Sequence, residues 1–207
     1  MILSDILNNK DSIETSFPLL GEGGYAKVFL INEEKVLKIS NHKSDGFRHV
    51  AALSEEQRQS IGFVNIFETF YDEENDHMYF LMERLFPLPF NKTQYPNIKK
   101  INRQLWENEY NFDFNHYNVI EQNIITKIFL LKTYMPSHLD YDWDIHVDNI
   151  MVDKKGNIKL SDPIAECMSL LPEFCTEEDI AKINQQKVEI TQFVYNIKPA
   201  INILKIS

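Results

Sequence analysis

The sequence predicts an α+β fold of two lobes in a single domain, and three observations point to it. The first 86 residues are rich in strand-like segments around a glycine-rich bend, with one helical stretch inserted. Three prolines in LFPLPFNKTQYP then interrupt any regular element. Beyond them the clearest pattern is helical. We therefore expect an N-terminal lobe over 1–86, with an antiparallel sheet plus one helix, and a reduced, mainly helical C-terminal lobe over 87–207.

Five strands are predicted in the N-terminal lobe. FPLL leading into GEGGYAKVFL, and then VLKIS, indicate three short strands around the glycine-rich bend. FVNIFETFY and HMYFLMERL alternate, carry many aromatic residues and are joined by the turn DEEND, so they give a fourth and a fifth. The helical stretch is FRHVAALSEEQRQS, which ends before Gly62, and a short helix is expected from Ile2 to about Asn9.

The C-terminal lobe is expected to contain a long helix, a hairpin and a final helix. Tyr117 to Tyr134 carries an apolar stripe at three- and four-residue steps, which indicates a core helix. Asn149 to Leu160 is a predicted hairpin with the turn DKKGN. T-E-E-D from Thr176 is a capping box that predicts the start of the last helix.

Composition limits the partners and the location. The chain has 207 residues, 43% of them hydrophobic, and a formal net charge of -10, which argues against nucleic acid as the main partner. The two cysteines, Cys167 and Cys175, are expected to be reduced thiols. The N-terminus does not resemble a secretory signal, and the longest apolar run is far too short to span a bilayer. We expect a cytoplasmic protein with no membrane partner.

The first candidate site is the glycine-rich bend LGEGGYAKV, which ends at Val28. Its glycines, Gly21, Gly23 and Gly24, would let the backbone, with Glu22 between them, approach a ligand and point N–H groups at phosphate oxygens. A strand follows the bend, which excludes a Rossmann site, and no Gly-Lys-Ser/Thr is present. In isolation such a bend is more often a simple turn.

The second candidate is Lys38 in KVLKIS, ten residues after Val28. A lysine in an alternating strand is usually a solvent-facing residue. Because Lys38 follows the glycine-rich bend at this distance, its position would also suit a lysine that holds the α- and β-phosphates of a nucleotide. Each candidate therefore supports the other.

The third candidate is the stretch DYDWDIHVDNIMVD, which allows two interpretations. As an extended strand it places Asp142, Asp144, His146 and Asp148 on one face, as in a metal-dependent hydrolase. As a loop that enters a strand it offers an acid, Asp144, and an amide, Asn149, five residues later, which favours phosphoryl transfer.

The hairpin that follows supports the second interpretation. Asp162 comes thirteen residues after Asn149, and a hairpin of this size brings its two ends together. An amide and a carboxylate oxygen are suitable ligands for Mg²⁺, which prefers phosphate oxygens for its remaining positions. Asp144 would lie beside the metal, where it could accept a hydroxyl proton.

Taken in order, these motifs resemble those of the protein kinases. GEGGYAKV is similar to G-x-G-x-x-G-x-V with Ala26 at the last glycine, KVLK to V-A-I-K, and DIHVDN to D-x-x-x-x-N, while Asp162 stands at the DFG aspartate. The resemblance implies that ATP and Mg²⁺ are bound. It also implies that HMYFLMER runs into a hinge where Met82, Glu83 and Arg84 meet the adenine.

The pattern D-x-H-x-x-N-I-M, followed by a short hairpin that ends in D-P, is similar to the small serine/threonine kinases of tailed bacteriophages. This resemblance implies a protein substrate, namely a host protein in the host cytoplasm, and self-modification. It leaves the oligomeric state open.

The sequence departs from the kinase pattern in several places. Asp142 stands two residues before Asp144, where most kinases have histidine, and no convincing A-P-E follows Asp162. The residues after Asp162 are Pro-Ile instead of Phe-Gly. No helical acid can be assigned as the partner of Lys38, because Ala51 falls near the expected position and Glu55 and Glu56 lie about one turn later. A pseudokinase that inhibits a partner therefore remains an alternative.

His146 keeps another alternative open. The D-x-H-x-x-N loop also occurs in aminoglycoside and fructosamine kinases, so the acceptor could be a small molecule. His146 would then steady the transferred phosphoryl group, or it is a structural hydrogen-bonding residue. The metal-hydrolase interpretation is the least favoured, because it leaves Lys38, the glycines and Asp162 without a role.

Overall fold

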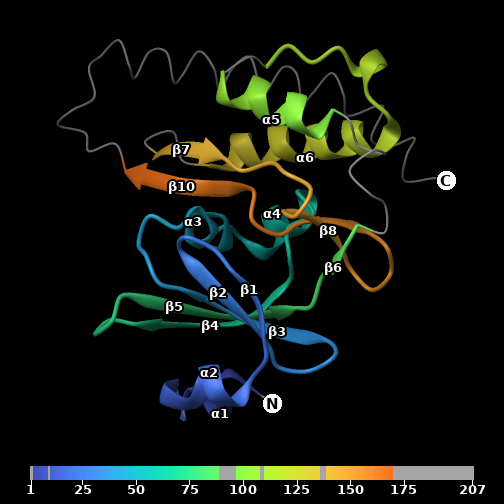
Figure 1. Ribbon diagram of the computed structural model, residues 1–207. Helices are drawn as coiled ribbons and strands as arrows, with labels where there is room; N and C mark the ends of the chain where they lie inside the picture. Colours follow the sequence, from blue (N-terminus) through green and yellow to red (C-terminus); the bar gives the residue numbers. More distant parts are fainter. Residues whose placement is uncertain (1, 9, 89–96, 108–109, 136–138, 170–207) are drawn as a thin grey trace.

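The computed structural model describes residues 2–8, 10–88, 97–107, 110–135 and 139–169 (Figure 1). It is an α+β fold with a five-stranded antiparallel sheet, as predicted, and two smaller sheets. The predicted helix from Thr176 and most of the proline-rich connector lie outside the described residues. Among those residues no helix is both long and apolar enough to cross a bilayer.

The five-stranded sheet contains the strands expected from the N-terminal half. They are β1 (Leu19–Glu22), β2 (Ala26–Leu30), β3 (Lys35–Ser40), β4 (Ile66–Asp72) and β5 (His77–Glu83), in the order β1-β2-β3-β5-β4. β3 is central, and its Lys38 pairs with Val28 on one side and Phe80 on the other. The glycine-rich bend is the β1–β2 connection, at the edge of the sheet.

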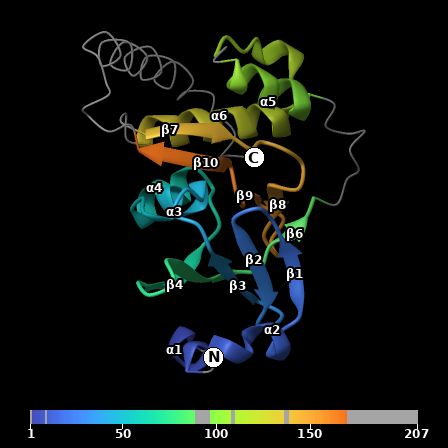
Figure 2. The ribbon, with the colours of Figure 1, turned by 60° about the vertical axis from the view of Figure 1, so that its left-hand side comes forward.

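Each face of this sheet has its own apolar layer, because side chains alternate along a strand. Leu37 and Leu81 face the short helices α1 (Leu3–Leu7) and α2 (Ile13–Ser16), which cover the outer face (Figures 1 and 2). Val36 and Phe80 belong to the larger core on the opposite face. Lys38 is two residues after Val36, so it points to the inner face and not to solvent.

The single helix predicted over FRHVAALSEEQRQS is wrong, because this stretch forms two helices. α3 (Gly46–Ala51) ends before Leu53, and α4 (Glu55–Ser60) begins after Ser54. The hydroxyl of Ser54 accepts the N–H of Gln57, whose side chain accepts the N–H of Ser54 in return. This capping box stabilises a new helix start.

The second half of the chain combines helices with strands. Among the described residues its helices are α5 (Ile98–Trp106), the 3-10 turn η2 (Phe114–His116) and α6 (Val119–Tyr134), the last close to its predicted range. The strand β7 (Leu139–Trp143), at the start of the stretch that allowed two interpretations, pairs antiparallel with β10 (Ile164–Ser169), which was not predicted. The described part of this half is therefore less purely helical than expected.

The predicted hairpin is formed by β8 (Ile150–Val152) and β9 (Ile158–Leu160). Its turn uses Gly156, at φ +83°, a left-handed conformation that glycine adopts without strain. β6 (Phe86–Pro87), which follows β5 after two residues, pairs with β8 and so joins the hairpin to the large sheet (Figure 2).

Candidate functional site

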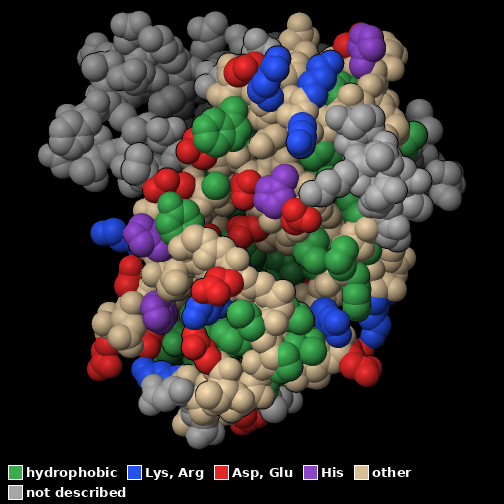
Figure 3. Space-filling model, viewed as in Figure 1, with side chains coloured by type: hydrophobic (Ala, Val, Ile, Leu, Met, Phe, Trp, Pro, Cys, Tyr) green, Lys and Arg blue, Asp and Glu red, His purple; other side chains and the backbone are tan. Residues whose placement is uncertain are grey.

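A cleft of about 660 Å³ lies between the five-stranded sheet and the β8–β9 hairpin. Figure 3 shows it as a hollow at the centre of this face, with acidic side chains and a histidine along its upper edge. The cleft is lined by residues from the glycine-rich bend, β3, the end of β5, the loop after β7 and the end of β9. Of the predicted site residues, those in the lining are Gly21, Glu22, Gly23, Gly24, Val28, Lys38, Met82, Glu83, Asp144, His146, Asn149 and Asp162.

The glycine-rich bend forms one wall of the cleft. The N–H of Gly23 donates to the carbonyl of Ala26 at 2.9 Å, which closes the bend. A Cβ atom built on Gly21, Gly23 or Gly24 would meet no heavy atom within 4 Å. The backbone of the bend is therefore open to a ligand, and local packing does not require these glycines.

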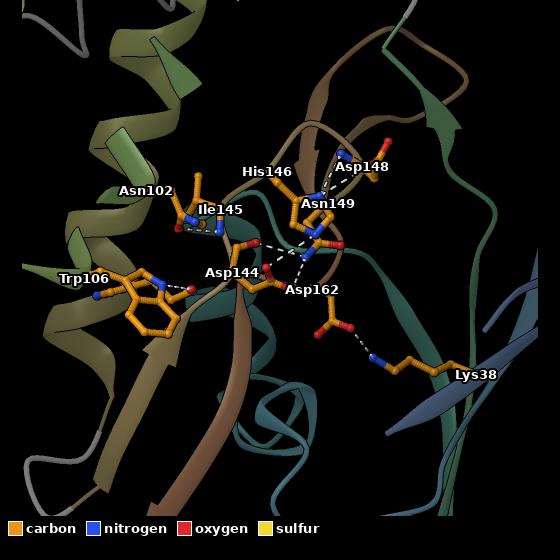
Figure 4. A network of polar contacts seen from close by, with 10 residues as sticks. Lys38, Asn102, Trp106, Asp144, Ile145, His146, Asp148, Asn149 and Asp162 are labelled. Carbon is orange, nitrogen blue, oxygen red and sulfur yellow. Dashed lines mark hydrogen bonds and ion pairs between the residues drawn. The ribbon is translucent and has the colours of Figure 1, made fainter. Parts of the chain in front are cut away.

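Lys38 lies at the centre of the charged part of the cleft. Its side chain is only 4% exposed, and its Nζ lies 2.7 Å from Oδ2 of Asp162 (Figure 4). The same Nζ is 3.8 Å from Oδ2 of Asp45 and 3.9 Å from the centre of the Phe47 ring. The interpretation of Lys38 as a solvent-facing lysine is thus wrong.

Asp144 and Asn149 are held together in the loop between β7 and β8. The Asn149 amide donates to the Asp144 carboxylate at 2.9 Å and to its backbone carbonyl at 3.0 Å. The N–H of Asp144 donates to the carbonyl of Pro163, and that of Ser161 to the carbonyl of Asn149. These bonds fix the loop against the segment that carries Asp162, as the hairpin argument predicted.

His146 lies between two carboxylates. Its Nε2 is 3.4 Å from Asp144 and its Nδ1 is 3.5 Å from Asp148. Nδ1 also accepts the N–H of Asp148 at 3.2 Å, so the neutral ring carries its proton on Nε2, facing Asp144. The hydrogen bond from His146 lowers the pKa of Asp144, and the same interaction raises the pKa of His146. Asp144 is therefore kept ionised near neutral pH.

α5 supports this loop from behind. The N–H of Ile145, a residue 1% exposed, donates to the side-chain oxygen of Asn102 at 3.0 Å. The indole of Trp106 donates to the carbonyl of Trp143 at 2.7 Å (Figure 4). Both contacts flank Asp144, so α5 fixes the backbone on each side of it. Sequence reasoning found neither residue.

The side-chain oxygens of Asn149 and Asp162 are suitable ligands for a hard divalent cation. Asp162 Oδ1 is buried and has no hydrogen-bond partner among the described residues. Asn149 uses its amide nitrogen toward Asp144, which leaves its oxygen as a possible ligand. Figure 4 shows both side chains on the same side of the loop, toward Lys38. One carboxylate and one amide oxygen suit Mg²⁺ that keeps waters or phosphate oxygens as its other ligands.

The end of β5 lines the apolar part of the cleft. Met82 and Glu83 belong to the lining, but Arg84 does not, and Leu85 does instead. The N–H of Arg84 donates to the carbonyl of Glu34 at 2.8 Å, and its guanidinium lies over the Phe86 ring. The structure thus separates Arg84 from the other two residues expected at this edge.

The strand interpretation of the DYDWDIHVDN stretch fails. β7 ends at Trp143, and Asp142 pairs with Glu166 of β10 outside the cleft lining. Within the part of the chain that the structure describes, no three His, Cys, Asp or Glu side chains are grouped to hold a metal. The structure therefore gives the hydrolase interpretation no support.

Sequence reasoning also missed the second acid beside Lys38, which is Asp45. Asp45 lies in the polar segment NHKSDG that leads into α3 and was not considered, whereas Glu55 and Glu56, which were considered, are exposed in the first turn of α4. The available signal was the sequence Asp-Gly-Phe before a helical run, since aspartate is a preferred N-cap residue.

Comparisons with known proteins show no family. No protein-family model matches the chain, and no curated protein matches it. Among solved structures, a chain from the CAK complex of Chaetomium thermophilum bound to ATP-γ-S is similar, with a TM-score of 0.42 and 14% identity. The similarity covers 84% of this chain and 53% of that chain, so this chain spans about half its length. A similarity at this level shows neither a family nor an activity.

Proposed function

We propose that this protein is an ATP-dependent phosphotransferase with a bilobal, kinase-like arrangement, and that it phosphorylates a serine or threonine hydroxyl of a protein. One observation carries the proposal. The glycine-rich bend, Lys38, Asp144, Asn149 and Asp162 line one cleft, although they come from four separate segments of the chain. The order of these motifs, which resembles that of the protein kinases, supports the same activity.

In this proposal the cleft binds ATP with its triphosphate under the glycine-rich bend. The N–H groups of the bend and the ammonium of Lys38 neutralise phosphate oxygens. The adenine would lie between Val28, Val36, Met82, Leu85 and Met151, which are among the apolar residues of the lining. Mg²⁺, held by Asn149 and Asp162, would supply charge neutralisation at the phosphates.

The chemistry assigned to the loop is proton acceptance. The acceptor hydroxyl approaches the γ-phosphorus, a new O–P bond forms, the bond to the β,γ-bridging oxygen breaks, and ADP leaves. Asp144 takes the hydroxyl proton, for which its lowered pKa keeps the carboxylate ready. His146, with Nε2 toward Asp144, orients that carboxylate and lies near enough to the cleft to contact the transferred group.

The phage-type resemblance supports a host protein as acceptor, with self-phosphorylation as a second reaction. A small molecule is the other acceptor class, and a pseudokinase that holds nucleotide without transfer is the third possibility. The assay should therefore offer three acceptors together with radiolabelled ATP: a bacterial lysate, a pool of aminoglycosides and metabolites, and the protein itself.

The decisive variant is Asp144→Ala, with Asp148→Ala as its matched control. Both acids line the cleft and contact His146 at similar distances, but Asp148 is 77% exposed, whereas Asp144 accepts the side-chain amide of Asn149. We expect transfer by the wild type and by Asp148→Ala, and loss of transfer in Asp144→Ala with nucleotide binding retained in a thermal-shift measurement. Equal labelling by wild type and Asp144→Ala would exclude the assigned base. Binding without transfer by the wild type would favour the pseudokinase.

A further inference from the structure

Lys38 faces two carboxylates with one positive charge. Oδ2 of Asp162 accepts a hydrogen bond from the Lys38 ammonium at 2.7 Å, whereas Oδ2 of Asp45 lies 3.8 Å from the same nitrogen. Asp45 is the more buried of the two acids, with a side chain 3% exposed against 34% for Asp162. Since a buried carboxylate is costly unless it is paired, the second acid needs a physical explanation.

The two oxygens of Asp45 have different roles. Oδ1 accepts the N–H of Phe47 at 3.0 Å and so caps α3. Oδ2 is buried and has no hydrogen-bond partner among the described residues. Capping accounts for one oxygen only. The unpaired oxygen is the one that points to Lys38.

Asp45 is held firmly in this place. It forms an isolated antiparallel bridge with Glu166 of β10. Next to it, Gly46 lies so close to Ile164 that a Cβ atom there would overlap both the side chain and the carbonyl of Ile164. β10 begins two residues after Asp162, so the two acids are fixed through the same segment.

We propose that Asp45 is a positioning residue that takes over the ammonium group of Lys38 when Asp162 engages a divalent cation. The movement is small, because a charged N–H···O bond is about 2.8 Å long, and the 3.8 Å gap therefore closes with a shift of about 1 Å. Asp162 is then free to act as a metal ligand, and Lys38 stays in place beside the phosphates. This inference deepens the proposed function and rests on it.

Without any nucleotide, a double-mutant cycle tests the shared lysine. Asp45→Asn keeps the capping oxygen and removes the charge. In the wild-type background it should leave the melting temperature unchanged or raise it, because one uncompensated buried charge is lost. In the Asp162→Asn background Asp45 is the remaining carboxylate partner of Lys38, so the same change should lower the melting temperature by about 3 °C or more.

Two controls separate the sharing of Lys38 from loss of the α3 cap and from neutralisation of any buried acid. Asp45→Ser, which also caps a helix, should behave as Asp45→Asn does. Asp72→Asn neutralises another buried acid, bonded to Lys10 at 3.0 Å, and its effect should be the same in both backgrounds. Equal effects of Asp45→Asn in the two backgrounds would overturn the proposal.

Nucleotide binding tests whether Lys38 changes its partner from Asp162 to Asp45. The affinity for AMP-PNP is measured by calorimetry, once with Mg²⁺ and once with EDTA. We expect Asp45→Asn to weaken binding of the magnesium complex roughly tenfold, as for loss of one charged hydrogen bond, and to leave binding in EDTA unchanged. Unchanged binding of the magnesium complex by Asp45→Asn would overturn the inference and leave the proposed function intact. Absence of binding by the wild type would overturn the proposed function, and the cycle alone would then decide whether Asp45 shares Lys38.

Discussion

Asn102 offers a test of how α5 positions the loop that carries Asp144. Its side-chain oxygen accepts the N–H of Ile145, which is buried next to Asp144. Asn102→Ala removes this acceptor and leaves the N–H without a partner. A buried donor left unpaired costs about 1–3 kcal/mol. We expect the free energy of unfolding to fall by that amount, as measured by urea denaturation.

Under the proposed function, the same change should slow phosphoryl transfer. If all of this energy served to hold Asp144 in place, its loss would correspond to roughly 5- to 150-fold in rate, and we expect about tenfold. Asn102 does not line the cleft, so the affinity for ATP should be unchanged. Steady-state kinetics should therefore show a lower kcat with the KM for ATP retained.

Two variants make this result specific. Asn102→Asp keeps an acceptor oxygen and should keep most of the stability. Gln104→Ala removes another hydrogen bond of α5, from the Tyr117 hydroxyl at 2.8 Å, without touching the loop, and should not change kcat. A wild-type kcat in Asn102→Ala, together with the expected loss of stability, would refute the positioning role.

Three further predictions concern stability. Burial lowers the pKa of Lys127 from 10.5 to about 8. Below pH 8 the lysine is charged in both states, and its burial destabilises the folded state by about 3 kcal/mol. Between pH 8 and 10.5 the folded protein releases the proton while the unfolded chain keeps it, so this destabilisation decreases as pH rises. Lys127→Met should therefore be about 2–3 kcal/mol more stable at pH 7 in urea denaturation, with a smaller gain in stability from pH 7 to 9.5; an unchanged gain would contradict this. Gly46→Ala should cost about 1–3 kcal/mol through overlap with Ile164, whereas Gly23→Ala, with open space around it, should cost less than about 1 kcal/mol; equal losses in thermal unfolding would argue against the close contact. Ser54→Ala should cost about 1 kcal/mol through loss of the α4 cap, and unchanged unfolding would show that the cap is dispensable.

The parts of the site that sequence could predict are those set by local rules. The strand period places Lys38 on the same face as Val36, and a hairpin of fixed length returns Asp162 to Asn149. Both rules depend only on spacing along the chain. Arg84 was expected at the cleft only from the resemblance to the protein kinases, and no spacing rule supported that position.

The remaining parts depend on contacts between distant segments. Asp45 reaches Lys38 only because α3 packs on β10, and β10 itself was not predicted, since its partner β7 precedes it by some twenty residues. Asn102 supports the loop from a helix more than forty residues away. Propensity and periodicity carry no information on such pairings.

The β8–β9 hairpin, which forms the floor of the cleft, is hydrogen-bonded to neighbouring segments along both of its strands. β8 pairs with β6, while Leu160 exchanges backbone hydrogen bonds with Gly62 and Val64. Ion pairs from Lys159 to Glu83, at 3.1 Å, and from Lys154 to Glu34 join the hairpin to the large sheet as well. Pulling the hairpin away would break all of these contacts together, whereas the glycine-rich bend lies at the sheet edge, where β1 pairs with β2 and the carbonyl of Tyr25 accepts the N–H of Asn41. In the proposed function, nucleotide would then enter and leave through movement of the bend, while the hairpin that forms the floor of the cleft keeps its place.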